Sequence, residues 1–202
     1  MKFLFDLGGV FFDWKPEYFY KNIFETNEDL NYFLDNVCTL EWNYKQDNGR
    51  PIKEAEEELI IKYPNYTKEI KLYYPNHRKM IGTVFQNSVD ILSKLYEENY
   101  LCYALSNWSA ETFEGMTRDY PFLKKFDGLL ISGEEKIVKP NKEIFELAID
   151  RFNLIPDNTV FIDDNLDNIN AAKKLNFRTI HLVDPYLINK EINKHLNYSK
   201  KA

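Results

Sequence analysis

Short apolar runs, each bounded by turn residues, alternate along this chain with longer segments of helical period. An apolar run of about 4–8 residues is typical of a buried strand, and its alternation with amphipathic helices favours a parallel sheet. The expected strands are residues 2–6, 100–105, 128–132, 159–163 and 178–182. The expected helices are residues 87–98, 110–118, 142–152, 168–175 and 186–195. The pattern predicts an α/β fold with a doubly wound, Rossmann-like parallel sheet.

Residues 14–85 interrupt this alternation, because they contain amphipathic helical segments such as residues 53–63 and no good strand. We expect a helical insert between the first strand and the rest of the sheet. Its aromatic side chains recur near helical spacing and are expected to pack the core of a small helical unit. They are Trp14, Tyr18, Phe19, Tyr20, Phe24, Tyr32, Phe33, Trp42 and Tyr44. We therefore divide the chain into a core of residues 1–13 and 87–202 and an inserted α-helical cap of residues 14–86.

Composition narrows the class of protein. Apolar residues make up 44% of the 202 residues and aromatic residues 16%, which is typical of a folded chain. A formal net charge of −6 disfavours nucleic acid or an anionic membrane as the main partner. The N-terminal apolar stretch is too short for a signal peptide and no later run reaches the length of a membrane span, so we expect a cytoplasmic protein. We also expect it to be a monomer or a weak homodimer. Cys38 and Cys102 are expected to be free thiols, and Cys102 to be buried.

Polar residues follow the predicted strands at the points where these strands end. In open α/β sheets the ligand lies outside the carboxyl ends of the strands, so these residues are expected to meet at one edge. The residues are Asp6, Ser106, Asn107, Trp108, Lys139, Asp163, Asp164 and Asp167.

The chemistry of these groups fits phosphoryl transfer. A carboxylate such as Asp6 can attack phosphorus and form an acyl-phosphate, which water then opens. Because both reactants carry negative charge, a cation is needed, and Asp164 with Asp163 beside it offers the hard oxygen ligands that Mg²⁺ prefers.

The remaining polar groups fit phosphate binding. The Ser106 hydroxyl can donate to a phosphate oxygen, and the backbone N–H groups of Asn107 and Trp108 add neutral donors. Lys139 supplies a fixed positive charge for the transition state.

Four segments resemble the motifs of the haloacid dehalogenase-like (HAD) hydrolase superfamily: residues 3–10, 105–107, 139–145 and 161–168. Their order and spacing agree across nearly the whole chain. The resemblance implies a Rossmann-like core with a helical cap after the first strand, and a magnesium-dependent phosphatase acting on a small phosphorylated metabolite. The Asp-Leu-Gly-x-Val form of the first motif is similar to a subgroup of bacterial sugar-phosphate phosphatases, notably glucose-1-phosphate phosphatase.

The resemblance also implies roles for single residues. Asp6 would be the nucleophile, and Lys139 would assist it. Asp6, the backbone carbonyl of Gly8 and Asp164 would hold the metal, with Asp163 beside them. Asp167 would support this site.

The chain departs from the family pattern at Gly8. Most phosphatases of the superfamily have there a second Asp, which protonates the leaving group and activates water, and such help is typically worth about 10²–10⁴-fold. Three outcomes stay open: a good leaving group, a substitute group from the cap or Asp13, or a slow or inactive enzyme. Asp13 also fits a turn between core and cap.

Two other functions stay open. The dehalogenase branch also lacks the second Asp, but it needs no Mg²⁺, whereas the dense acidic segment at Asp163, Asp164 and Asp167 favours metal and phosphate. A non-catalytic member would bind a phosphorylated ligand or a protein partner. The histidines, His77, His181 and His195, show no metal-ligand spacing and are expected to be structural.

Substrate identity is expected to lie in the cap, which closes over the core in capped phosphatases. Residues 42–50 offer aromatic faces, amides and charges that suit a sugar, and they also fit an ordinary cap surface.

Overall fold

The computed structural model of the protein describes residues 1–199, so residues 200–202 of the predicted core lie outside the described residues. Its centre is a five-stranded sheet in the order β5-β4-β1-β6-β7, in which every neighbouring pair is parallel. The strands are β1 (Lys2–Phe5), β4 (Leu101–Ser106), β5 (Gly128–Ile131), β6 (Thr159–Asp163) and β7 (Arg178–His181). The predicted parallel α/β sheet is confirmed, and each predicted strand lies within about one residue of an observed one.

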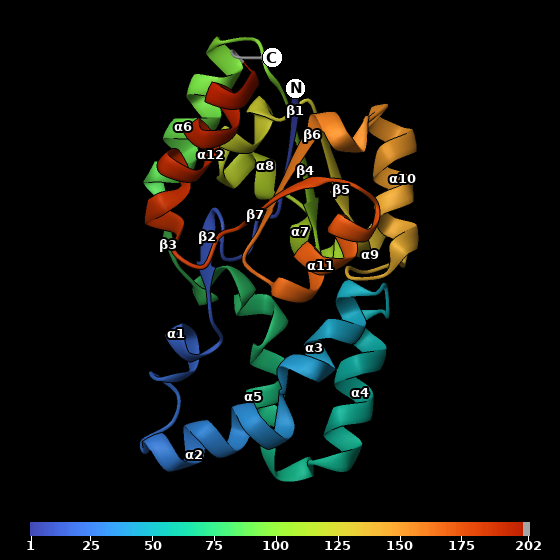
Figure 1. Ribbon diagram of the computed structural model, residues 1–202. Helices are drawn as coiled ribbons and strands as arrows, with labels where there is room; N and C mark the ends of the chain where they lie inside the picture. Colours follow the sequence, from blue (N-terminus) through green and yellow to red (C-terminus); the bar gives the residue numbers. More distant parts are fainter. Residues whose placement is uncertain (200–202) are drawn as a thin grey trace.

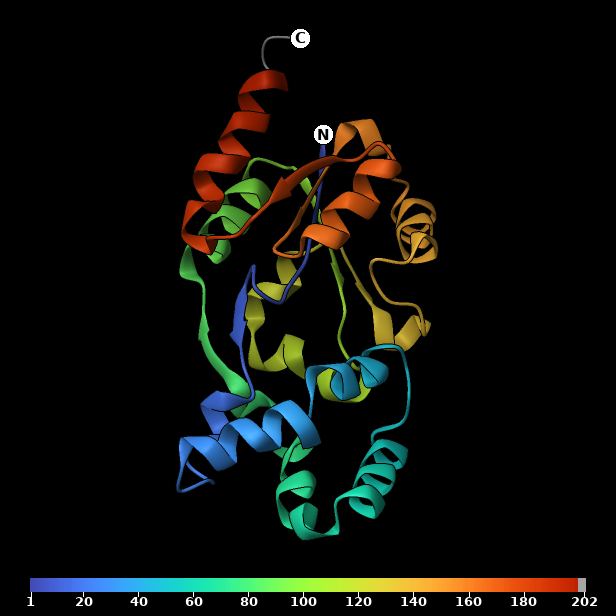
Figure 2. The same ribbon diagram turned by 60° about the horizontal axis from the view of Figure 1, so that its bottom comes forward.

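Helices cover both faces of this sheet (Figures 1 and 2). Successive side chains of a strand point to opposite faces, and β1 shows the result. Phe3 and Phe5 pack in one fully buried cluster with side chains of α6 and α12, whereas Leu4 packs in a second cluster with side chains of α10 and α11. These helices are α6 (Gln86–Glu97), α10 (Lys142–Phe152), α11 (Leu166–Lys174) and α12 (Ile188–Ser199). Because both faces of the sheet are buried at its centre, β1, β4 and β6 are mostly apolar and buried, whereas the edge strand β7 has only Ile180 buried.

The predicted single helix over residues 110–118 is wrong. Two short helices, α7 (Ala110–Phe113) and α8 (Met116–Asp119), stand there instead. Gly115 between them has a φ of 78°, a left-handed conformation that breaks the helical hydrogen-bond pattern and that glycine adopts without steric cost. The other short helices of the core are α9 (Ser132–Glu135), η4 (Pro121–Lys125), η5 (Pro156–Asn158) and η6 (Pro185–Leu187).

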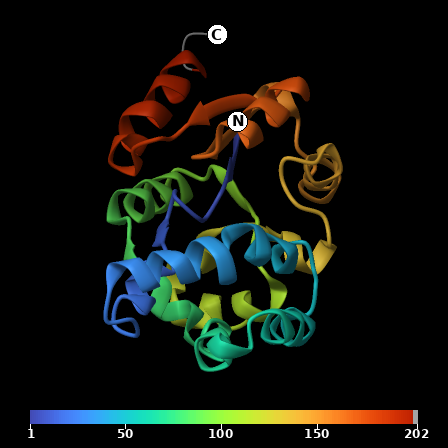
Figure 3. The same cartoon turned by 90° about the horizontal axis from the view of Figure 1, so that it is seen from below.

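The insert between β1 and α6 is largely helical and lies below the sheet in Figure 1, across the front in Figure 3. Its elements are α1 (Glu17–Tyr20), α2 (Asn27–Tyr32), η1 (Phe33–Val37), α3 (Leu40–Asp47), α4 (Ile52–Lys62), η2 (Pro64–Tyr66), α5 (Thr67–Leu72) and η3 (Tyr74–Met80). They enclose a hydrophobic cluster of their own that includes Tyr20, Phe33 and Trp42, as expected for the aromatic residues. Tyr32 and Tyr44 differ, because both are exposed. The cap limits at residues 14 and 86 stay a prediction.

The prediction that residues 14–85 contain no good strand is wrong at the end of this segment. β3 (Ile81–Val84) pairs antiparallel with β2 (Phe12–Trp14) where the chain leaves and re-enters the core (Figure 1). The segment Ile81–Val84 has only four residues, one of them a glycine, so its sequence shows little of the alternation that is typical of a strand. The strand forms because β2 pairs with it. At Gly82 any side chain would overlap the ring of Tyr18.

Cys38 and Cys102 are both free, as predicted. Cys102 is buried, as predicted, and Cys38 is buried as well. Among the described residues, none of the helices combines the length and the apolar character that a bilayer crossing requires.

Candidate active site

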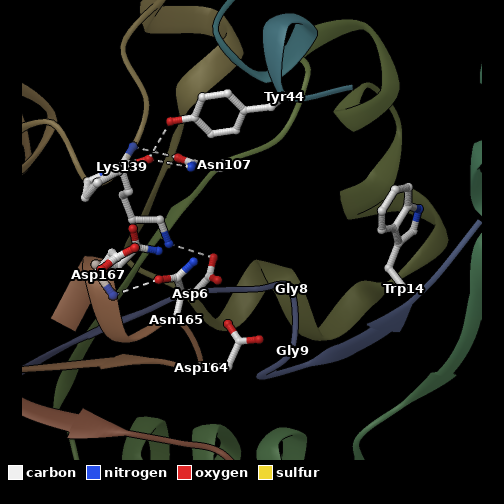
Figure 4. Close-up of a pocket in the computed structure, with 12 residues that line it drawn as sticks. Asp6, Gly8, Gly9, Trp14, Tyr44, Asn107, Lys139, Asp164, Asn165 and Asp167 are labelled. Carbon is white, nitrogen blue, oxygen red and sulfur yellow. Dashed lines mark hydrogen bonds and ion pairs between the residues drawn. The ribbon is translucent and has the colours of Figure 1, made fainter. Parts of the chain in front are cut away.

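Polar groups from three neighbouring strands meet at the carboxyl edge of the sheet. Asp6 follows β1, Asn107 follows β4, and Asp163 and Asp164 lie at the end of β6. Asp6, Asn107 and Asp164 border a cavity of about 520 Å³, which Lys139 and Tyr44 also line (Figure 4). The predicted gathering of strand-end residues is therefore present in the fold.

Lys139 lies buried between two carboxylates. Its Nζ atom is 2.9 Å from Asp6 Oδ1 and 2.7 Å from Asp163 Oδ2, and its side chain is 1% exposed. Burial opposes the charge on Lys139, but the charges of Asp163 and Asp6 raise its pKa overall. Burial also raises the pKa of Asp6 to about 7 against the opposing charge of Lys139, and repulsion from Asp163 and Asp164 adds to the rise. Lys139 is thus a fixed cation beside the predicted nucleophile.

Asp163 is fully buried and its oxygens are already bound. Oδ1 accepts the backbone N–H of Asn165 at 2.8 Å, and both oxygens accept the side-chain amide of Asn168 at 3.1 Å. With Lys139 as a further donor, Asp163 holds the lysine in place. Asn168 belongs to residues 161–168, the last of the four segments that resemble the family motifs. That position in the sequence is the signal that could have identified this role of Asn168.

Carboxylate oxygens of Asp6, Asp163 and Asp164 lie within 4.8 Å of one another. Oxygen ligands on opposite sides of Mg²⁺ are about 4 Å apart, so a group of this size can surround a magnesium ion. Because both oxygens of Asp163 already accept hydrogen bonds, Asp6 and Asp164 are the better placed of the three to bind it. Gly8 borders the same cavity, and Asp167 is exposed and also lines it.

Gly9 is required by the shape of this loop. It has a φ of 66°, and a Cβ atom built on it would overlap the carboxylate of Asp164. At Gly8, by contrast, a Cβ atom would meet no heavy atom of the described residues within 4 Å.

The Gly9→Ala variant is therefore expected to unfold more easily than the wild type by about 1–3 kcal/mol and to bind Mg²⁺ more weakly. Gly8→Ala is the matched control and is expected to leave the stability within about 0.5 kcal/mol of the wild type. Urea denaturation and magnesium titration of both variants check this, and equal stabilities would contradict it.

The predicted phosphate binders have different positions. Asn107 lines the cavity, but its side chain is engaged with the backbone of Lys139, accepting its N–H at 2.8 Å and donating to its carbonyl at 2.9 Å. Ser106 is 1% exposed at the end of β4 and is not among the residues lining the cavity within the described chain. The predicted amide contact of Trp108 does not fit this arrangement, because that N–H donates to Ser132 Oγ at 3.0 Å.

A second, smaller cavity of about 80 Å³ adjoins the first, since both are lined by Gly8, Trp14 and Asn107. Trp108 and His77 line it too, and the His77 ring centre lies 5.2 Å from that of Trp14 and 5.7 Å from that of Trp108. Burial lowers the pKa of His77 to about 3. Within the described residues, Trp14 Nε1, His77 Nδ1 and Trp108 Nε1 are buried without a hydrogen-bond partner. Sequence reasoning treated His77 as structural and missed its place at this cavity.

Helix α3 of the insert contacts the core at these cavities. The Tyr44 hydroxyl donates to the Lys139 carbonyl at 2.9 Å, and Ser132 Oγ donates to the Asp47 carbonyl at 2.6 Å. Asp47 lines the second cavity. Burial raises the pKa of Asp47 to about 7, opposed by a hydrogen bond from the Ser109 backbone and reinforced by the charge of Asp6. Both Tyr44 and Asp47 belong to residues 42–50, which the sequence left open between a sugar-binding role and an ordinary cap surface.

Asp13 is engaged elsewhere. Its carboxylate accepts a hydrogen bond from the Tyr18 hydroxyl and lies 3.7 Å from Lys15 Nζ. Among residues 1–199, the linings of both cavities are made without it.

Comparisons with known proteins place this geometry in context. A family model described as haloacid dehalogenase-like hydrolase matches residues 4–182. A phosphorylated carbohydrates phosphatase of Thermotoga maritima is 25% identical over 88% of this chain and 82% of its own length. An (S)-2-haloacid dehalogenase of Burkholderia cepacia is 26% identical over 48% of this chain and 42% of its own length. The structure of a HAD family enzyme of Bacteroides thetaiotaomicron, in complex with magnesium and inorganic phosphate, has a TM-score of 0.71 at 23% identity, covering 89% of this chain and 92% of that one.

Proposed function

The chain belongs to the haloacid dehalogenase-like hydrolases, and on that premise we propose that it is a magnesium-dependent phosphatase that hydrolyses a small phosphate monoester through an aspartyl-phosphate on Asp6. The observation that carries the proposal is the arrangement of Asp6, Lys139 and Asp163. A carboxylate and a buried cation stand 2.9 Å apart at the edge of a cavity large enough for a phosphate group.

The same site offers ligands for the metal ion that this reaction needs. Asp6, Asp164 and the carbonyl of Gly8 would hold Mg²⁺, and Asp163 and Asp167 would support them. When bound, the ion would neutralise charge on the phosphate and so allow an anionic nucleophile to approach it.

The chain's own residues then divide the work. An oxygen of Asp6 attacks phosphorus, and the positive charge of Lys139 stabilises the charge spread over the phosphate oxygens. Asn107 holds the backbone of Lys139 by two hydrogen bonds and so positions this charge. The backbone N–H of Asn107, a residue that lines the cavity, is the first proposed donor to the phosphate. The Ser106 hydroxyl is the second, and it would have to turn toward the cavity from its buried position at the end of β4.

The second cavity supports a proposal for the substrate class. Two tryptophans and His77 line it with aromatic side chains, and Asn43 and Asp47 line it with polar ones, so a leaving group with an apolar ring face and hydroxyl groups would match both. A sugar phosphate or a similar polyol phosphate therefore fits best. The phosphorylated carbohydrates phosphatase among the relatives agrees with this choice.

Dehalogenation is the second candidate, because a haloacid dehalogenase is also among the relatives. The three carboxylates within 4.8 Å of one another argue against it. Such a cluster repels a departing halide, whereas it suits a site that holds Mg²⁺.

The test is phosphate release from a panel of sugar phosphates and acetyl phosphate. We expect turnover with Mg²⁺, a fall to background with EDTA, and full recovery when Mg²⁺ is restored, because removing the cation leaves Asp6 facing an anionic phosphate. Chloride release from 2-chloropropionate is measured in parallel. Chloride release that EDTA does not affect, with no phosphate release, would replace the phosphatase by a dehalogenase.

A further inference from the structure

Hydrolysis of an alkyl phosphate requires a proton at the leaving oxygen. When Asp6 attacks, the electron pair of the bond between phosphorus and the leaving oxygen passes to that oxygen, and an unprotonated alkoxide leaves slowly. Gly8 has no side chain to supply this proton. Lys139 is held between two carboxylates, and the low pKa of His77 keeps its ring neutral.

On the basis of the proposed phosphatase function, we infer that Asp47, at the end of cap helix α3, is the catalytic general acid and base of the reaction and works in the room that Gly8 leaves open. Asp47 and Gly8 line the same cavity. A Cβ atom on Gly8 would meet nothing of the described chain within 4 Å, so this space is free for a group that comes from the cap.

Two hydrogen bonds, one of them to Asp47, hold the end of α3 against the core. The Ser132 hydroxyl donates to the carbonyl of Asp47 itself, and Ser132 also accepts the N–H of Trp108, a residue that lines the cavity. One helical turn earlier, Tyr44 binds the carbonyl of Lys139. The end of α3 is therefore tied to the lysine beside the nucleophile and to the loop that follows β4, which positions a catalytic carboxyl more precisely than a mobile cap surface would.

The surroundings of Asp47 support proton transfer near neutral pH. Burial favours its neutral form, the Ser109 backbone favours its charged form, and the charge of Asp6 favours a proton on Asp47. His77 faces the same cavity, and Tyr74 interacts with the charge of Asp47. A carboxyl group whose pKa lies near the working pH transfers protons most effectively in both directions.

The two half-reactions balance with this assignment. In the first, Asp6 forms a bond to phosphorus, the bond to the leaving oxygen breaks, and the proton of Asp47 moves to that oxygen to give an alcohol. In the second, the Asp47 carboxylate takes a proton from water as the water oxygen attacks phosphorus. The bond to Asp6 then breaks, phosphate leaves, and Asp47 is again protonated.

The experiment compares leaving groups in the Asp47→Asn variant. Because an alkoxide needs the proton and acetate does not, we expect kcat/KM for a sugar phosphate to fall by about 10²–10⁴-fold, and that for acetyl phosphate to fall by less than about 10-fold. Asp13→Asn is the matched control, since Asp13 lies beside the core–cap connection but lines neither cavity among the described residues, and both substrates should keep their rates.

A second substitution tests the position as well as the chemistry. In Asp47→Asn, the added change Gly8→Asp places a carboxyl in the open space, and we expect kcat/KM for the sugar phosphate to recover at least about 10-fold while kcat/KM for acetyl phosphate changes little. Thermal melting of each variant reports whether it is folded.

Three outcomes would overturn the inference. One is an Asp47→Asn variant with unchanged rates on every substrate, which would leave the phosphatase function standing. Another is an equal loss of kcat/KM on sugar phosphate and acetyl phosphate, which would indicate a purely structural role. Absence of phosphate release by the wild type would overturn the proposed function and this inference with it.

Discussion

Asn in place of Asp6 is expected to lower phosphate release by about 10⁶-fold, the loss typical of removing an enzyme's nucleophile. The amide has nearly the shape of the carboxylate, but it cannot attack phosphorus to give an acyl-phosphate. The fold should persist, because Lys139 keeps Asp163 as a partner at 2.7 Å. Turnover of the best sugar phosphate from the panel, measured with saturating Mg²⁺, gives the size of the loss.

The Asp6→Asn variant needs a covalent readout beside the rate. Acid-quenched wild type mixed with substrate should carry one phosphoryl group by mass spectrometry, and the Asp6→Asn variant should carry none. Asp13→Asn, a second change of Asp to Asn close in sequence, serves as control and should be labelled like the wild type. A variant at Asp6 that still acquires the label would place the nucleophile elsewhere.

The strands of the sheet could be predicted because their environment leaves a simple trace in the sequence. A parallel strand buried on both faces has to be apolar at every position, and the segments around Phe3, Ala104 and Phe161 show this as continuous runs. The order β5-β4-β1-β6-β7 has no such local trace, since it depends on which strands pair across long separations.

Where local signals are weak, tertiary contacts decide the structure. The segment Ile81–Val84 forms a strand because β2 pairs with it. The segment is short and contains Gly82, so its sequence shows no clear strand pattern. At Gly115 the apolar spacing continues through the residue, so the pattern indicates one helix. The backbone nevertheless turns left-handed there and divides the segment in two.

The candidate site was predictable to the same extent. In open α/β sheets ligands bind outside the carboxyl ends of the strands, and this rule predicts that Asp6, Asn107 and Asp164 meet at one edge. Each of them follows the last residue of a strand, and those strands are neighbours. The rule cannot say which donors are already used inside the protein. The amide of Trp108 binds Ser132, and nothing in the order of residues indicates that pair.

The position of Asp47 lies furthest from what sequence can predict. It depends on how the insert docks on the core, which is set by side-chain contacts such as that of Tyr44 with the carbonyl of Lys139. The docking of the insert therefore bears both on which substrate is bound and on which group acts as the general acid. The part of the chain that would read the leaving group also brings in the carboxyl that we propose protonates it.

Lys139→Met is expected to have the second large effect, on both stability and activity. Lys139 is 1% exposed, and its removal leaves the carboxylates of Asp6 and Asp163 buried without their cation. Breaking a buried pair from one side costs about 3–5 kcal/mol, which for a chain of this size lowers the melting temperature by roughly 6–20 °C. Loss of the cation should also lower turnover by about 10³-fold, as for other preorganised donors at a developing charge.

The pH dependence separates a lost charge from lost packing. Asp6 has a folded pKa of about 7, above its ordinary value of 3.8, so its contribution to stability is full below that ordinary value and is lost as pH rises through the folded pKa. Lys139 opposes this rise, so its removal moves the pKa of Asp6 further upward. Without Mg²⁺, the Lys139→Met deficit in melting temperature should therefore be larger at pH 8 than at pH 5. Lys142→Met, which removes an exposed lysine paired only with Glu146 among the described residues, should melt like the wild type at both pH values. A Lys139→Met deficit independent of pH would mean that the lysine stabilises the core through its hydrocarbon stem, with its charge contributing nothing to stability.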